Sequence, residues 1–175
     1  MMSDGMDFLS LAQQRYSVRR FTDEPVRQED LDRILTAAIV APTACNLQPW
    51  HVYVLQSPEA VAKLPDCTRC HFGCRTALLI CQNQESSWER PYDGKRSGEV
   101  DASIVTTHMM LEAEAIGVGS TWVMHFRPAA VRESYQLPDH EEPVALLVLG
   151  YPAKDAQPSP RHSEFRPETE LVTVL

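Results

Sequence analysis

The sequence contains no uninterrupted apolar run of the roughly 20 residues that a bilayer-spanning helix needs. Residues 1–10 are acidic and also lack an unbroken hydrophobic segment, so we expect no secretory signal and a cytoplasmic location. Neither a GxGxxG fingerprint nor a Walker P-loop occurs, which removes two common nucleotide-binding signatures. Internal repeats are absent as well, and a chain of 175 residues is expected to form one domain.

Basic residues are in the minority: 16 Lys and Arg face 24 Asp and Glu, which gives a formal charge of −8. This balance argues against nucleic acid or an anionic membrane as the main partner. A small phosphorylated ligand is still compatible with it, because a local cluster of cations can oppose the net charge. Nearly all of the basic residues are Arg, whose forked guanidinium group suits carboxylate and phosphate.

The cysteines are odd in number, and without an export signal we expect free thiols rather than disulfides. They are Cys45, Cys67, Cys70, Cys74 and Cys81. Residues 67–71 match the C-x-x-C-H pattern of haem attachment, and Cys74 extends the cluster. A metal or haem protein is the least favoured hypothesis, because zinc or an iron–sulfur cluster would need a fourth ligand and only His71 lies nearby. We prefer a turn that packs small thiols before a strand, with no metal site.

Hydrophobic periodicity predicts helices mixed with short strands and no regular βαβ alternation, which favours an α+β fold. The expected helices are 7–15, 28–41, 58–64, 98–116 and 127–135, and the expected strands are 50–56, 76–81, 143–149 and 171–175. The 98–116 helix is apolar nearly all round, which predicts burial on most sides, against this chain or a second subunit. The segment 152–175 is rich in proline and charge, and we expect this tail to pack on a partner.

Two arginines flank a hydroxyl just after the first expected helix. Arg15, Ser17 and Arg19 alternate, so in an extended segment all three side chains point to one side. Such a group is suited to bind an anion. The alternative for this segment alone is a solvated basic patch that pairs with Asp23, Glu24 or Asp30.

Small residues, two amides and two prolines gather in residues 41–50, between an expected helix and an expected strand. Small side chains let the backbone approach a flat ligand, and the amides of Asn46 and Gln48 offer donors and acceptors to a heteroaromatic edge. The alternative is a rigid connecting loop without a ligand.

Taken in order along the chain, these motifs resemble the nitroreductase family of FMN-dependent oxidoreductases. The matching motifs are R-x-S-x-R-x-F at 15–21, A-P-T-x-x-N-x-Q-P-W at 41–50, D-A-S-x5-M-x-L-x-A at 101–113, G-V-G-S-T-W at 117–122, E-P-V-A-L-L at 142–147, G-Y-P at 150–152 and R-P at 166–167. The resemblance implies a three-layer fold, with a central and mostly antiparallel sheet flanked by helices, in an intertwined homodimer.

The resemblance also implies a flavin site built from both subunits. Arg15 would hold the FMN phosphate, Ser17 the phosphate or ribityl chain, and Arg19 the N1/O2 edge of the ring. A cation at that edge stabilises the negative charge that collects there on reduction. The residues implied to reach the flavin from the opposite subunit are Pro42, Thr43, Ala44, Asn46 and Gln48.

Further implied contacts come from the second half of the chain. Backbone at Met124 and His125 would face N5 and O4 of the ring, and Arg166 would add a second phosphate contact. The chain departs from the family in two places: many relatives have glycine at position 125, and Glu164 stands where a second basic residue is common. The chain is also shorter than typical members, which leaves less material to cover a substrate. Thr68 or His71 could approach the pyrimidine side.

The implied activity is transfer of hydride from NADH or NADPH, through FMN, to a flat electrophile such as a nitroaromatic or a quinone in ping-pong turnover. No dedicated catalytic acid or base is visible, which fits hydride transfer with protons taken from water. The alternative is a non-catalytic flavin-binding sensor or carrier.

Overall fold

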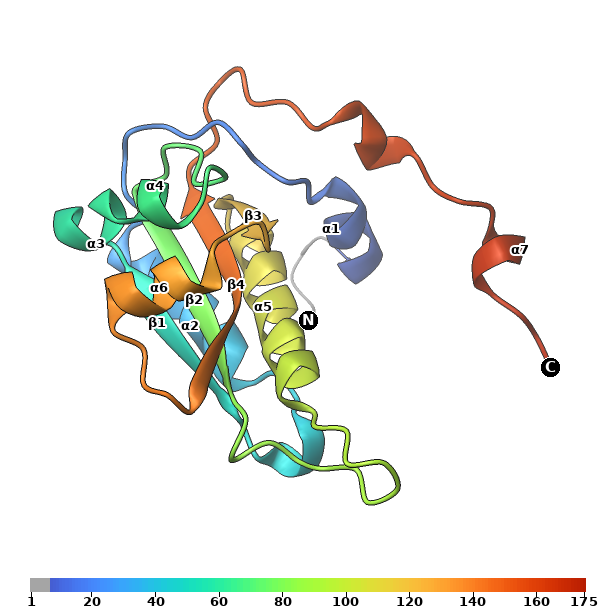
Figure 1. Cartoon of the computed structure of the whole chain (residues 1–175). Coiled ribbons are helices and arrows are strands. Elements are labelled where there is room, and N and C mark those ends of the chain that lie inside the picture. The colour runs from blue at the N-terminus through green and yellow to red at the C-terminus, as the bar shows by residue number, and fades with distance from the viewer. Residues whose placement is uncertain (1–6) are drawn as a thin grey trace.

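The computed structural model describes residues 7–175, and its centre is a four-stranded sheet (Figure 1). In sheet order the strands are β1 (Trp50–Leu55), β2 (Thr76–Asn83), β4 (Glu141–Gly150) and β3 (Gly119–Val123). Every neighbouring pair runs antiparallel, which confirms the predicted α+β class with an antiparallel sheet. The expectation of no secretory signal rests partly on residues 1–6, which lie outside the described residues.

Helices cover both faces of the sheet, so the molecule has three layers (Figure 1). On one face lie α2 (Gln28–Ile39) and α5 (Gly98–Ala115), packed against Leu78 and Ile80 of β2. On the other face lie α4 (Leu64–Cys67) and α6 (Pro128–Tyr135), packed against Leu79. Because side chains alternate along a strand, the continuous apolar run of β2 supplies both cores at once. Each fully buried Leu or Ile stabilises the fold by about 1.5–3 kcal/mol.

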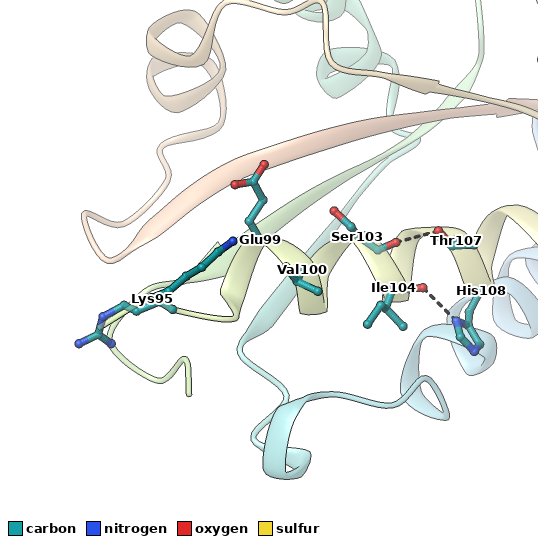
Figure 2. Close-up of a pocket in the computed structure, with 8 residues that line it drawn as sticks. Lys95, Glu99, Val100, Ser103, Ile104, Thr107 and His108 are labelled. Carbon is teal, nitrogen blue, oxygen red and sulfur yellow. Dashed lines mark hydrogen bonds between the residues drawn. The ribbon is translucent and has the colours of Figure 1, made fainter. Parts of the chain in front are cut away.

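The long helix α5 has one buried face and one open face. Val105 and Met109 are buried in the core between α5 and the sheet, whereas Val100 on the outer side is 53% exposed. Figure 2 shows Val100, Ile104 and His108 projecting from the same side of the helix. This outer side lines an open cavity of about 670 Å³. Within the described chain the helix is therefore buried against the sheet and against α2, while the side that carries Val100 stays open.

Most elements expected from the sequence are present within a few residues. The first helix, α1, spans Phe8–Gln14, and Asp7 caps it through its carboxylate. The expected 58–64 helix is interrupted: α3 (Pro58–Ala62) ends and α4 begins around Lys63. Pro65 explains the break, because proline has no N–H to continue the helical ladder and restricts the residue before it.

Two expectations about strands were wrong. The first error is an omission: no strand was expected at β3, whose five residues include Gly119, Ser120 and Thr121 and form a strand because β4 pairs with them. The expected strand 171–175 is absent: α7 (Glu168–Leu171) takes its place, followed by chain with no strand pairing within residues 7–175. An extended segment is not a stable strand unless it is hydrogen-bonded to a neighbouring strand.

The C-terminal segment leaves the body of the molecule. After β4 it passes a short 3-10 helix, η2 (Pro160–Ser163), and then runs outward to α7 (Figure 1). Several of its large apolar side chains are exposed: Phe165, Leu171, Val172, Val174 and Leu175. Such a tail buries little apolar surface within its own chain.

Candidate functional site

The segment that follows α1 is held in extended form beside β3. The Val18 N–H donates to the Ser120 carbonyl at 3.0 Å, and the Thr121 hydroxyl donates to the Val18 carbonyl at 2.6 Å. Ser17 forms an isolated parallel bridge with Ser120. The contact is so close that a Cβ on Gly119 would lie 2.7 Å from Val18 Cγ2. Glycine at position 119 therefore allows the arginine-bearing segment to dock on the sheet.

This docking brings the predicted anion-binding side chains together. They line one cavity of about 310 Å³, called here the arginine cavity, whose walls are Arg15, Tyr16, Ser17, Arg19, Ser159, Arg161 and His162. Neither Arg15 nor Arg19 forms an ion pair with an Asp or Glu of residues 7–175, although the Arg19 guanidinium donates to the Ser17 carbonyl at 3.3 Å. The ion pairs with Asp23, Glu24 or Asp30 that the alternative expected are not formed by Arg15 or Arg19, although Arg19 is exposed. Asp23 pairs with Arg75, and Asp30 pairs with Arg27.

Arg161 and His162 are cavity residues that sequence reasoning missed. They lie on η2, whose first turn is capped by the Ser159 hydroxyl. The available signal was a Ser-Pro start followed by two basic residues inside an otherwise irregular tail. Glu114, near the end of α5, is the acid beside this group. Burial raises its pKa above the ordinary value, while the charges of Arg15 and His162 act in the opposite direction.

The 42–48 loop has unusual backbone geometry. It contains the short 3-10 helix η1 (Ala44–Asn46), and three of its non-glycine residues have left-handed φ angles: 51° at Cys45, 54° at Asn46 and 51° at Gln48. Each such residue costs about 1–2 kcal/mol relative to a right-handed conformation. Backbone strain of this kind persists where the surroundings enforce it, and it clusters at ligand-binding segments.

Asp101, in the first turn of α5, holds the 42–48 loop in this strained conformation. Its side chain is buried, at 2% residue exposure, and accepts from the Ala44 N–H at 2.9 Å and from the Ser97 hydroxyl at 2.7 Å. Within the loop, the Gln48 N–H donates to the Thr43 hydroxyl at 3.0 Å. Asp101 begins a motif that carries the family resemblance, but the sequence did not reveal this positioning role.

One chain does not bring the loop and the arginine cavity together. Ala44 is hydrogen-bonded to the first turn of α5, whereas Glu114, which interacts with Arg15, belongs to its last turn. Asp101 and Glu114 are thirteen positions apart along the helix, which is about 20 Å at 1.5 Å per residue. The two groups of predicted flavin residues therefore lie at opposite ends of α5.

Met124 and His125 follow directly after β3. Both are exposed, and the His125 carbonyl accepts a hydrogen bond from the buried Thr68 hydroxyl. The His125 ring lies beside Cys70, with Nδ1 4.0 Å from Sγ. Thr68 thus reaches this segment, whereas the ring of His71 accepts from the Gly73 N–H instead.

Arg166 lies on the outward tail and is not part of the arginine cavity of this chain. Its guanidinium pairs with Glu170 of α7 at 3.1 Å, in the same exposed segment as Glu164. The second phosphate contact implied for Arg166 therefore remains a prediction that would require the tail to meet another subunit.

The cysteines are free, and three of them are buried. Burial raises the pKa of the Cys74 thiol to about 11 and that of Cys81 to about 12. Cys67 and Cys74 pack in the core between α4, α6 and the sheet. Across residues 7–175, no group of three or more His, Cys, Asp or Glu side chains is placed to hold a metal ion. None of the helices described has the length and apolarity to cross a membrane.

The fold is that of nitroreductase-type proteins. It matches the crystal structure of a nitroreductase family protein from Clostridium difficile 630 with a TM-score of 0.90 and 39% sequence identity, over 96% of this chain and 98% of the other. The sequence model of the nitroreductase family matches residues 12–73 and 69–151. The chain belongs to the nitroreductase family, as its motifs predicted.

Two curated relatives carry enzyme names. A NADH dehydrogenase of Thermus thermophilus is 29% identical, over 89% of this chain and 92% of its own length. An FMN reductase [NAD(P)H] of Bacillus subtilis is 31% identical, over 83% of this chain and 66% of its own length. Both relatives are oxidoreductases that use nicotinamide nucleotides by name.

Proposed function

We propose that this chain is an FMN-dependent oxidoreductase that takes hydride from NADH or NADPH and passes the electrons to an electrophilic acceptor such as a nitroaromatic or a quinone. Family membership and the two named relatives support the cofactor and the donor. The single observation that carries the proposal is the arginine cavity, which gathers three guanidinium groups without carboxylate partners among the described residues of an acidic chain.

The residues present fit a flavin mononucleotide. Three guanidinium groups and the Ser17 hydroxyl match a phosphate, which arginine forks bind well. Ser120 lies beside Ser17, and His125 is five residues further along the chain, just beyond the end of β3. In an extended chain the distance from Ser120 to His125 is roughly 16 Å. An FMN molecule with its phosphate beside Ser17 and its ring beside His125 would span this distance. Arg19 would supply the cation that tunes the ring.

FMN, when bound, supplies the redox chemistry, and the chain binds, orients and tunes it. Backbone at Met124 and His125 would hold the ring edge, with the Thr68 hydroxyl fixing the His125 carbonyl. We assign no side chain as catalytic acid or base, and protons would come from water. Since donor and acceptor would use one exposed ring face in turn, turnover would be ping-pong.

The functional unit would be a homodimer with the 152–175 tail packed on the partner. The separation of the 42–48 loop from the arginine cavity supports this, because the loop of a second subunit would then complete the site. The open outer face of α5 and the exposed apolar residues of the tail also support it. The cytoplasmic location remains a prediction from the sequence.

The test is the visible spectrum of the purified protein before and after anaerobic addition of NADH or NADPH. Flavin bands that bleach support the oxidoreductase, and parallel lines in double-reciprocal plots with a nitroaromatic or quinone support ping-pong turnover. Flavin bands that persist with either donor would instead support the sensor or carrier. A colourless protein that cannot be reconstituted with FMN would overturn the proposal.

A further inference from the structure

The arginines of this chain differ in what their guanidinium groups contact. Most form ion pairs with Asp or Glu, namely Arg20, Arg27, Arg33, Arg75, Arg90, Arg96 and Arg166. Arg132 instead donates to the backbone carbonyls of Leu137, Pro138 and Glu141. The remaining arginines have no carboxylate partner within residues 7–175, and all of them line one of two cavities. Arg15, Arg19 and Arg161 line the arginine cavity, and Arg69 and Arg127 line another.

This other cavity, called here the second cationic cavity, has a volume of about 420 Å³. Its walls are Pro65, Cys67, Thr68, Arg69, His125, Phe126 and Arg127. The guanidinium of Arg127 donates to the Asp66 carbonyl, and that of Arg69 has no hydrogen-bond partner among the described residues. The neighbouring carboxylate of Asp66 is exposed and pairs with neither arginine. Two exposed arginines thus line this cavity, and neither forms an ion pair with an acid among the described residues.

The two arginines are carried on segments that are tied together. The Arg127 N–H donates to the Cys67 carbonyl at 2.9 Å, and the Thr68 hydroxyl donates to the His125 carbonyl. The Thr68 hydroxyl in turn accepts from the Cys70 N–H at 2.9 Å. These bonds fix the two backbone segments relative to each other, so Arg69 and Arg127 line the same cavity before any ligand arrives. Preorganisation of this kind lowers the cost of binding.

The cavity adjoins the end of the site where the flavin ring is expected. His125 forms part of its wall, whereas on the proposed function the phosphate of FMN would bind at the arginine cavity, at the other end of β3. An anion in the second cavity therefore belongs to a different molecule, one that approaches the ring. We propose that the second cationic cavity binds an anionic group, phosphate or carboxylate, of the substrate that exchanges electrons with the flavin.

This inference rests on the proposed function and narrows its substrate class. Nicotinamide dinucleotides carry a pyrophosphate, and NADPH carries a further 2′-phosphate. An electron acceptor with a carboxylate could bind in the same way, because guanidinium groups donate paired hydrogen bonds to carboxylate as well as to phosphate. The dinucleotide and the acceptor are separate sources of the anion, and the experiment distinguishes them.

The experiment compares Arg69→Gln and Arg127→Gln with the wild type and with Arg75→Gln. Arg75 is a matched control, because it is an exposed arginine that pairs with Asp23 at 3.7 Å and lines neither cavity. With FMN-loaded protein, adenosine 2′,5′-bisphosphate and pyrophosphate are titrated by calorimetry. KM is then measured for NADPH, for NADH, and for 4-nitrobenzoate against nitrobenzene.

We expect each cavity variant to lower the affinity for at least one of these anions, or raise the KM of an anionic substrate, by about tenfold, as the loss of a charge-assisted contact predicts. Arg75→Gln should change none of these values. Weaker binding of the bisphosphate and a higher KM for NADPH, with an unchanged KM for NADH, would identify the 2′-phosphate as the bound group. Equal loss for NADPH, NADH and pyrophosphate identifies the pyrophosphate group. Loss for nitrobenzoate alone identifies an acceptor carboxylate.

Unchanged affinities and KM values in both cavity variants would overturn the inference. A fall in FMN affinity without any change for the anions would also overturn it, because it would place Arg69 or Arg127 in the flavin site. Failure of the proposed function has a separate signature: the wild-type protein would not bind FMN at all in a direct titration.

Discussion

The carboxylate of Asp101 and the backbone N–H of Ala44 are joined by a hydrogen bond of 2.9 Å, although the two residues are 57 positions apart. Through this bond the first turn of α5 holds a loop with three strained backbone positions. The other carboxylate oxygen is bonded to the Ser97 hydroxyl, so both oxygens have a partner.

Asp101→Ala should therefore release the 42–48 loop. Leaving the Ala44 N–H without a partner is expected to lower the free energy of unfolding by about 1–3 kcal/mol. FMN affinity should fall as well, since the loop is part of the proposed site. Urea unfolding and a fluorescence titration with FMN measure the two effects. Asp139→Ala, at an exposed position with no ion pair to a described residue, controls for the change in charge. A loss of stability with unchanged FMN affinity would contradict a role for the loop in binding.

Arg161→Ala tests a cavity residue that the sequence did not single out. Removing a charge-assisted contact to phosphate should weaken FMN binding by about 1.5–3 kcal/mol, and Arg15→Ala should act in the same range. Arg75→Ala serves as the control, and a titration of apo-protein with FMN gives all four affinities. If Arg161→Ala matched the control while Arg15→Ala did not, η2 would not contribute to phosphate binding.

Mixed dimers test whether each site draws on two chains. Asn46→Ala damages the loop and Arg15→Ala damages the arginine cavity, so a mixed dimer would hold one doubly damaged site and one intact site. With random reassortment of equal amounts, half of the dimers are mixed, and about a quarter of the wild-type activity should return. The measurement is activity at limiting FMN after the two variants are unfolded and refolded together. No recovery would mean that both groups serve a site within one chain.

The hydrogen bond between the partly buried Tyr151 and the buried Asp30 predicts a pH dependence of stability. The Tyr151 hydroxyl donates to Asp30 at 2.6 Å, and with the Arg27 guanidinium it holds the pKa of that carboxyl below its ordinary value of 3.8. A lowered pKa in the folded state stabilises the fold above pH 3.8, and this contribution is lost as pH falls through the lowered pKa.

Tyr151→Phe removes the largest cause of the shift. We expect a loss of about 1–2 kcal/mol at pH 7, because a hydrogen bond to a charged group disappears. The difference from wild type should shrink below pH 3.8 as Asp30 is protonated in both proteins. Urea midpoints between pH 2.5 and 7 provide the comparison. A difference that stayed constant over this range would assign the effect to packing rather than to Asp30.

Thiol reactivity should separate the cysteines by burial. The thiolate is the reactive form, and burial raises the pKa of Cys67, Cys74 and Cys81. A thiol reagent such as dithiobisnitrobenzoate at pH 8 should therefore modify only the exposed Cys45 and the half-buried Cys70 without denaturant. Rapid modification of three or more thiols would contradict the packed arrangement of the cysteine cluster.

Local signals in the sequence predicted much of this fold. Leu31, Ile34 and Ala38 at helical spacing predicted α2, and Pro42 just beyond its end marked the stop. The strand β3 escaped detection because its residues become a strand through pairing with β4, and the sequence of the strand itself carries no such information. For the same reason the 171–175 segment, although apolar and β-branched, lacks a neighbour and forms no strand.

The candidate site was predicted where it is contiguous and missed where distant segments meet. Arg15, Ser17 and Arg19 stand out because they alternate within five residues. Arg161 joins them only because the chain returns along β4 to the same end of the molecule. The role of Asp101 depends on a bond to a loop 57 residues away, which no local pattern encodes.

The placement of the loop and the arginine cavity at opposite ends of α5 has a thermodynamic consequence. If a bound flavin touches both chains, it binds the dimer and not the separated subunits, so cofactor retention and subunit association are linked. Dilution below the dimer dissociation constant would then release the cofactor, and saturation with FMN would tighten the dimer by the same factor. Thermal stability would rise with protein concentration, and the measured FMN dissociation constant would depend on the protein concentration of the assay.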